Sequence, residues 1–189
     1  GNKLWERNYG AAYSAAVSDA VNTHDGGFLL VGTTNTPGDP AKNDVYVLRV
    51  DQAGGKLWEK TFGGSEADWA SCVCSAGDGG FVLAGGTHSF GGYRIYVLKI
   101  DRAGTKVWEK TLGNSGLVSS MTQTSGGYVL AGRTASIPEP GSLDVYLLKI
   151  DGAGNLIWQT TLGGPSDEAA SSIAESWEEG FIVAGTSGE

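Results

Sequence analysis

Two short acidic stretches contain the residues best suited to binding a ligand or to acid–base catalysis. Glu66 and Asp68 come just before Trp69, and Asp167 and Glu168 occupy the related stretch later in the chain. A tryptophan beside carboxylates can stack on a sugar or hold a cation. Two carboxyl groups across a cleft could instead act as the acid and base of a glycosidase. The competing interpretation is a tryptophan that covers the top of the core, with solvated acids around it.

The two histidines of the chain, His24 and His88, fall in different connections. His24 lies in a tight turn, whereas His88 shares a longer loop with Tyr93. A Ser–His–Asp triad would need His88, and no nucleophile-elbow sequence accompanies it. We therefore predict no catalytic residue and group His88 and Tyr93 with the acidic stretches as candidate ligand-binding residues.

Metal and cofactor motifs are not visible. Cys72 and Cys74 are two residues apart on a predicted strand, so both point to one face and an intrachain bridge is disfavoured. Two thiols without a nearby histidine make a poor zinc site. Asp51, Asp101 and Asp151 read as turn residues that accept backbone N–H bonds, because the spaced acidic pattern of a calcium loop is lacking. We predict no metal site and no cofactor.

These candidates are carried by an internal repeat with a period near 50 residues. One phrase places a glycine four residues before each of four tryptophans: Trp5, Trp58, Trp108 and Trp158. A second phrase is an aromatic residue, three aliphatic or small residues and a glycine, and it begins at Phe28, Phe81, Tyr128 and Phe181. A third runs from Tyr46 to Asp51 and recurs at 96–101 and 146–151. Three phrases in one order predict one repeated structural unit.

Each unit reads as four short antiparallel strands joined by tight turns. The phrase at 81–85 is apolar on both faces, so both faces should be covered. The strand at 107–112 carries charges, as suits a sheet edge. Such units predict an all-β fold, a β-propeller of about four blades of ~50 residues in a single domain over 1–189. The repeats span 11–62, 63–112 and 113–162, with the fourth formed by 163–189 and 1–10. We expect the eight aromatic residues that mark the first two phrases to fill the gaps between blades.

The strand count is one short of four complete blades. Residues 1–10 match the fourth strand of a repeat, and the chain reaches only the second strand of its last repeat. This gives fifteen strands, with a gap between the second and fourth strands of the last blade. The chain could be a fragment of a longer propeller, half of a larger ring made with a second copy, or a ring that closes imperfectly alone.

Composition narrows the classes of partner. The 189 residues include 21 acidic and 13 basic side chains, a formal charge of −8, which disfavours nucleic acid and anionic membranes. The apolar runs are shorter than the ~18 residues of a membrane span, so we predict no membrane insertion. No signal peptide is visible.

The repeated phrases resemble known propeller proteins. The hairpin at 96–111, with its tryptophan, is similar to blades of quinoprotein-type propellers. The run Asp78-Gly-Gly-Phe-Val-Leu-Ala-Gly-Gly-Thr87 followed by Tyr96-Val-Leu-Lys-Ile-Asp101 more closely resembles repeats of secreted or surface propeller proteins of bacteria and archaea, most without assigned activity. The resemblance implies an extracellular, cell-surface or periplasmic protein and no reaction. It carries no quinone site, because no cofactor-facing motif accompanies the tryptophans.

Strand alternation assigns the connections to two faces. The turns between the first and second strands, and between the third and fourth, are short and uniform; we call their side the turn face. The other connections, among them 34–43, 87–93 and 134–143, vary and form the loop face. Variable loops on a rigid scaffold are the usual place for binding.

We therefore expect a non-enzymatic scaffold that binds a protein or a glycan through the loop face, or that completes a ring with another copy at the open seam. One alternative is a propeller hydrolase or lyase acting on polysaccharide through the loop carboxylates. Another is a fragment with no independent function that assembles with other blades.

Overall fold

The computed structural model describes residues 1–10, 14–36, 39–113, 116–135, 142–177 and 180–188. Within these ranges the chain forms fourteen β-strands and no helix, which confirms the prediction of an all-β protein. The strands are β1 (Ala15–Asn22), β2 (Phe28–Thr36), β3 (Asp39–Val50), β4 (Lys56–Phe62), β5 (Asp68–Ser75), β6 (Phe81–Thr87), β7 (Arg94–Ile100), β8 (Lys106–Leu112), β9 (Gly116–Thr124), β10 (Gly127–Ala135), β11 (Leu143–Ile150), β12 (Leu156–Leu162), β13 (Glu168–Glu175) and β14 (Phe181–Ser187).

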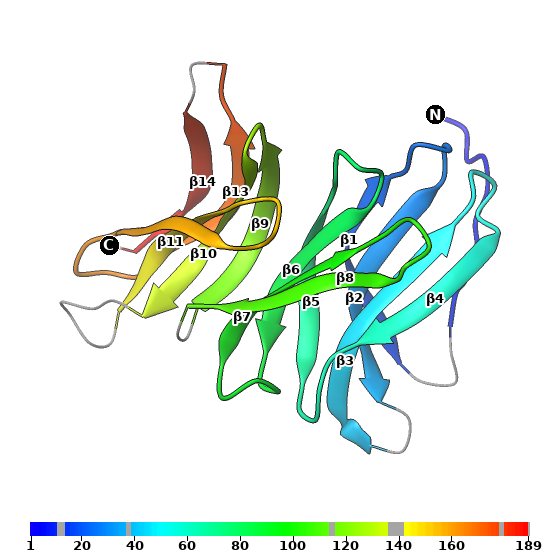
Figure 1. Ribbon diagram of the computed structural model, residues 1–189, viewed down its shortest axis with the longest axis horizontal. Coiled ribbons are helices and arrows are strands. Elements are labelled where there is room, and N and C mark those ends of the chain that lie inside the picture. Colours follow the sequence, from blue (N-terminus) through cyan, green and yellow to red (C-terminus); the bar gives the residue numbers. More distant parts are fainter. Residues whose placement is uncertain (11–13, 37–38, 114–115, 136–141, 178–179, 189) are drawn as a thin grey trace.

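The strands form four antiparallel sheets, which we number in chain order (Figure 1). The first three contain four strands each, β1–β4, β5–β8 and β9–β12, and neighbours in sequence are neighbours in the sheet. The fourth sheet contains only β13 and β14. Each complete sheet therefore corresponds to one predicted repeat.

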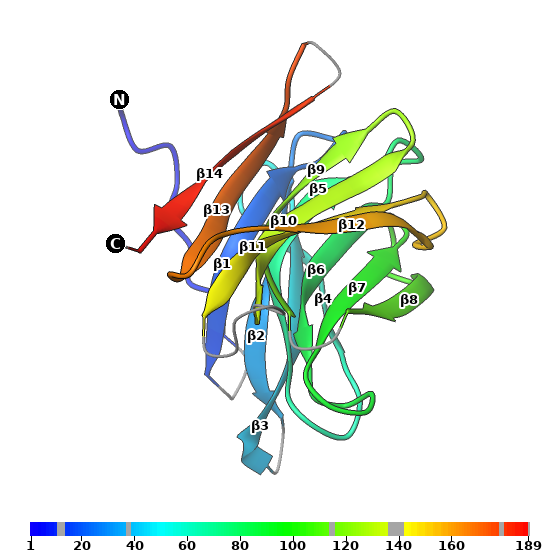
Figure 2. The ribbon, with the colours of Figure 1, turned by 90° about the vertical axis from the view of Figure 1, so that its left-hand side faces the viewer.

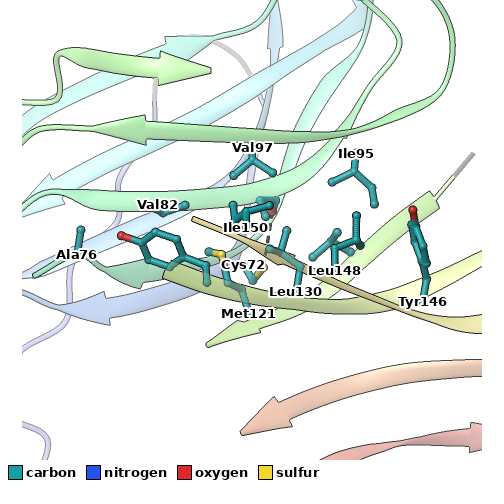
Figure 3. Close-up of a cluster of buried hydrophobic side chains, with 13 residues drawn as sticks. Cys72, Ala76, Val82, Ile95, Val97, Met121, Leu130, Tyr146, Leu148 and Ile150 are labelled. Carbon is teal, nitrogen blue, oxygen red and sulfur yellow. Dashed lines mark hydrogen bonds between the residues drawn. The ribbon is translucent and has the colours of Figure 1, made fainter. Parts of the chain in front are cut away.

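Both faces of the central strands are buried because the sheets pack on each other in sequence order. Apolar side chains of the first and second sheets form one cluster, those of the second and third another, and those of the third and fourth a smaller one. Figure 3 shows the cluster between the second and third sheets, where Val82 and Ile95 face Leu130 and Leu148. Every residue of β6 is buried, as its unbroken apolar sequence predicts.

The edge strands and the turns also match the sequence pattern. The charged strands β4 and β8, and the uncharged β12, each lie at one edge of a four-stranded sheet. In the turn before β8, Asp101 Oδ1 accepts hydrogen bonds from the backbone N–H groups of Ala103, at 2.9 Å, and Thr105, at 2.7 Å. Gly104 in this turn has a φ of 74°, which a side chain would disfavour. The predicted role of the repeated aspartates as turn residues is thus confirmed.

Each repeated tryptophan reaches from its own repeat to the following sheet. The ring of Trp58 lies over Gly104 and that of Trp108 over Gly154, so close that a Cβ at either glycine would stand about 3 Å from ring atoms. Trp158 contacts Phe181 of the fourth sheet, with ring centroids 6.5 Å apart. The tryptophans therefore couple successive sheets.

The expected strand at residues 1–10 is not formed, so the prediction of fifteen strands is wrong for the described chain. Its tryptophan nevertheless docks like the others. The Trp5 ring lies over Gly54, and its Nε1 donates to the Gln52 carbonyl at 3.0 Å. A strand needs a neighbour that accepts its ladder bonds, and this segment is held by side-chain contacts instead. The two chain ends lie at opposite ends of the array of sheets (Figure 1), so the chain does not close on itself here.

A β-bulge at a serine recurs in the first strand of every sheet (β1, β5, β9 and β13), at Ser18, Ser71, Ser119 and Ser171. The residue after the bulge bridges to the next sheet in two cases. Asp19 Oδ2 accepts the Val73 N–H at 2.9 Å, and Ser120 Oγ accepts the Ile173 N–H at 3.3 Å. At the same position in β5 stands Cys72, which is buried in the cluster of Figure 3. Cys72 and Cys74 are both free thiols, and burial raises the pKa of each.

The fourth sheet, which faces the viewer in Figure 2, is the exposed end of the array. Ile182 on β14 is 66% exposed, whereas its counterparts Val82 and Val129 are fully buried. Trp177, which lies between β13 and β14, is fully exposed. Val82 and Val129 are covered by the sheet that follows their own, and in the described chain no following sheet packs on Ile182.

Candidate functional site

Backbone hydrogen bonds join the connections of the loop face in pairs. The His88 N–H donates to the Ala67 carbonyl at 2.8 Å, and in the fourth sheet Gly188 donates to the Asp167 carbonyl at 2.8 Å. The predicted grouping of connections is therefore correct. The predicted loop at 34–43 is instead largely strand, because β2 continues to Thr36 and β3 begins at Asp39.

Three of the predicted ligand-binding residues come together on this face. We call Trp69, His88 and Tyr93 the aromatic cluster. The Trp69 ring centroid lies 5.8 Å from that of His88 and 5.6 Å from that of Tyr93, and the last two are 5.2 Å apart. Trp69 belongs to β5, and the other two follow β6 and precede β7. Each ring touches both of the others.

A glycine opposite Trp69 makes room for its ring. Trp69 and Gly86 are direct partners in the β5–β6 ladder, and the indole occupies the space where a Cβ on Gly86 would lie. The other sheets have Thr33, Arg133 and Thr186 at this ladder position. The second sheet therefore differs from the others by a matched pair of residues.

The aromatic cluster is accessible and has polar surroundings. Trp69 and Tyr93 are half-buried and His88 is exposed. Burial raises the pKa of Tyr93, and the nearby Arg133 guanidinium acts in the opposite direction. Beside His88 lies a cavity of about 200 Å³ lined by Ser65, Glu66, Ala67, Asp39 and Lys42. The site thus combines aromatic surface with groups that can donate and accept hydrogen bonds.

Asp68 holds the loops next to the aromatic cluster in place. Its side chain has no exposed surface. Its Oδ2 accepts the Gly64 N–H and the Ser89 hydroxyl, both at 2.7 Å, while Ser89 Oγ also accepts the Glu66 N–H at 2.9 Å. In this arrangement Asp68 fixes two loops beneath the cluster and does not reach solvent.

The acidic residues pair with partners that the sequence analysis did not single out. Asp68 and Asp44 each place an oxygen where a Cβ on Gly63 would lie. Glu168 and Asp144 do the same at Gly163. The sequence analysis missed a charged position that recurs two residues before the tyrosine of the third strand of each repeat, at Asp44, Arg94 and Asp144.

The predicted carboxylates are divided between two sheets. Asp68 and Glu168 lie on different sheets, β5 and β13, and each faces an aspartate of the sheet before its own. Glu168 accepts the Gly164 N–H at 2.9 Å, which repeats the role of Asp68. Asp167 accepts the Leu143 N–H at 2.8 Å through Oδ1. Three of the four predicted carboxylates thus bond the backbone of neighbouring loops, and Glu66 alone lines a cavity.

Several larger grooves lie between successive sheets, and two of them occupy equivalent places in the repeat. One, of about 490 Å³, is lined by Arg94, Tyr146 and Gln159 among others, and the other, of about 410 Å³, by Lys42, Tyr96 and Glu109 among others. In both grooves the tyrosine hydroxyl donates to the acidic or amide residue at 2.6 Å. These pairs occupy equivalent places in the repeat, so we attribute them to the scaffold.

Further properties of the described chain bear on function. Its His, Cys, Asp and Glu side chains form no group of three or more able to hold a metal ion. It has no helix that is long and apolar enough to cross a membrane. A scan against protein-family models and a search of curated proteins find no match for this sequence.

Proposed function

We propose that the protein is a non-enzymatic scaffold of the β-propeller type that binds a carbohydrate through the aromatic cluster on its loop face. The observation that carries this proposal is the mutual contact of Trp69, His88 and Tyr93 beside a polar cavity. Because these residues depart from the repeat, the packing of the sheets does not require them.

Sugar chemistry matches the composition of the site. The C–H faces of a pyranose pack against aromatic rings, and its hydroxyl groups need both donors and acceptors. Trp69 and Tyr93 offer the aromatic surface, while Glu66, Asp39 and Lys42 line the adjoining cavity. Ligand sites are typically apolar pockets with a few polar groups that set orientation.

The propeller arrangement is supported by the stacking of the sheets. Each sheet is a four-stranded meander whose tryptophan reaches the following sheet, and the first strands of all four sheets carry the same bulge. A radial array covers both faces of such sheets. An extracellular or cell-surface location is supported by the resemblance of the repeats to exported propeller proteins.

The test is a titration with a panel of soluble oligosaccharides, followed by intrinsic tryptophan fluorescence and calorimetry. We expect at least one glycan to bind, and Trp69→Ala and Tyr93→Ala to abolish binding. Trp177→Ala is the matched control, because this tryptophan is fully exposed but lies between β13 and β14 on the turn face. A panel without any binder, or binding that survives both cluster variants, would overturn the proposal.

We also propose that the fourth sheet associates with a second copy of the chain. The supporting observation is the exposure of Ile182 at a position that is fully buried in the second and third sheets. Light scattering coupled to size exclusion should show a species larger than the 19.5 kDa monomer, and Ile182→Lys should return it to a monomer. A monomer at every concentration would contradict self-association and leave the glycan site unaffected.

A further inference from the structure

The junction between the third and fourth sheets holds a buried carboxylate that lacks a partner. Asp144, at the start of β11, is 6% exposed, and its Oδ1 receives no hydrogen bond. This same oxygen and Glu168 Oε2 are the two atoms nearest to the position of a Cβ on Gly163. The unpartnered oxygen of Asp144 is therefore directed into a small space that Glu168 also faces.

Glu168 is held in place by groups that donate hydrogen bonds to it. Its Oε2 accepts the Gly164 N–H at 2.9 Å, and its Oε1 accepts the Ser187 hydroxyl at 3.4 Å. In the part of the chain that the structure describes, neither Asp144 nor Glu168 forms an ion pair. Burying negative charge without compensation is costly.

The equivalent junctions show how this charge is balanced elsewhere. Asp44, Arg94 and Asp144 occupy the same ladder position, each opposite a threonine. At the first junction Lys42 Nζ lies 3.6 Å from Asp44 Oδ1. At the second junction, Arg94 stands in place of the aspartate. The third sheet has Gly116 at the position that Asp68 occupies in the second sheet and Glu168 in the fourth.

A cationic side chain is thus present at the first two junctions, and Ser142 stands at the place of Lys42 in the third. The third junction combines two carboxylates with no cation from the described chain. The first junction also holds an unpartnered buried oxygen, Asp68 Oδ1, but Lys42 supplies positive charge there. The third junction is therefore the one where a cation from solution would be needed.

We propose that Asp144 and Glu168 bind a hard divalent cation, with Ca²⁺ as the representative ion, between the third and fourth sheets. The available ligands are oxygen atoms only, which is the donor type that Ca²⁺ and Mg²⁺ prefer. Two protein carboxylates leave the other coordination positions to water, so we expect weak binding, with a dissociation constant on the order of 1 mM. The ion would tie β11 to β13. This site is separate from the aromatic cluster and does not depend on the proposed function.

The experiment measures Ca²⁺ binding by equilibrium dialysis and thermal unfolding at constant ionic strength, with Na⁺ as the reference ion. We expect one Ca²⁺ per chain and a higher unfolding temperature in Ca²⁺ than in Na⁺. Asp144→Asn and Glu168→Gln should each abolish this gain. Without divalent ions, Asp144→Asn should be at least as stable as the parent chain, because it removes repulsion between the carboxylates.

Two glycine variants provide a matched test of the position of the site. Gly163→Ala places a methyl group in the space between the two carboxylates and should abolish the Ca²⁺ effect. Gly164→Ala is the control, because a Cβ there meets no atom within 4 Å and the N–H that Glu168 accepts is retained. Equal Ca²⁺ effects in both variants, or no Ca²⁺ binding to the parent chain up to 10-fold above the ~1 mM expected, would overturn the proposal.

Discussion

Trp69 and Gly86 face each other across the β5–β6 ladder, and the indole ring fills the space that any side chain on Gly86 would occupy. No other sheet has this pair. The relationship fixes the ring that joins His88 and Tyr93 in the aromatic cluster. It also makes Gly86, a backbone position at the end of β6 next to the loop, a determinant of the proposed site.

Gly86→Ala should therefore disrupt the cluster without touching a ligand. The added methyl group must displace the indole or the strand, at a cost of about 1–3 kcal/mol in the free energy of unfolding. Chemical denaturation measures this loss, and glycan titration should show weaker binding. Gly126→Ala is the control, because a Cβ there meets nothing within 4 Å. An unchanged fluorescence spectrum and affinity in Gly86→Ala would contradict this account of Trp69.

Trp108 and Trp69 should respond differently to truncation. Trp108 packs in the cluster between the second and third sheets, and its ring covers Gly154. Trp108→Ala should cost about 3 kcal/mol, the lower end of the range for aromatic truncations, because the ring is partly buried against an apolar core cluster. Trp69→Ala should cost clearly less, because its equally half-buried ring packs against His88 and Tyr93 on the loop face and not in a core cluster. Urea denaturation of both variants decides the point, and equal losses would assign Trp69 to the core.

Alkaline pH should weaken the fold through the buried tyrosines. Burial, together with the hydrogen bond to Glu59, raises the pKa of Tyr46 to about 12, and burial raises that of Tyr128 to about 12. Since the unfolded value is about 10, folding favours the neutral form. The stabilisation of the fold by the neutral tyrosines is complete below pH 10 and is lost as the pH rises towards 12.

Tyrosinate absorbance and the unfolding temperature, both followed against pH, test this expectation. Tyr46→Phe should reduce the loss of stability between pH 10 and 12. If this variant lost stability over that range as steeply as the parent chain, Tyr46 would not be the source of the effect.

Acid should act through Asp25 on the turn face. Hydrogen bonds from Thr23 and Arg102, and its contact with the buried Arg49, hold the pKa of Asp25 well below its usual range. A lowered pKa gives stability that is present above about pH 4, the unfolded value, and is lost as the pH falls. Arg102 belongs to the second sheet, so this contact also links two sheets.

Asp25→Asn should lower the unfolding temperature at pH 7 and flatten its fall at acidic pH. Glu175→Gln, which neutralises an exposed acid on β13 with no ion pair in the described structure, is the control and should leave the profile unchanged. A parallel shift of the whole Asp25→Asn profile, with the same acid slope as the parent, would argue against the linkage.

The repeat was sufficient to predict the sheets, because hydrophobic phrases, turn aspartates and glycines all point to the same hairpins. Asp101 and Gly104 show this agreement, since one supplies the turn bonds and the other the left-handed backbone. The segment around Trp5 shows the limit. Its sequence matches that of β4, but a strand also requires a neighbour, and local sequence does not report whether one is present.

The candidate site was predictable only where it departs from the repeat. Trp69, His88 and Tyr93 stood out because the other repeats lack them. The burial of Asp68 was not visible, because an acidic residue in a loop sequence is usually solvated. Asp144 was overlooked because it lies near the start of a mostly apolar strand. Its significance depends on Glu168, which reaches it only through the packing of the third sheet on the fourth.

The contact of each tryptophan with the following sheet gives the array a direction. Trp58 and Trp108 each stabilise the sheet that follows their own in the chain. Trp158 contacts Phe181 in the two-stranded fourth sheet. In arrays of this kind, stability is shared between adjacent units. Amide exchange should accordingly be fastest in β13 and β14 and slow down towards the second sheet, so that fraying begins at the C-terminal end and advances one sheet at a time.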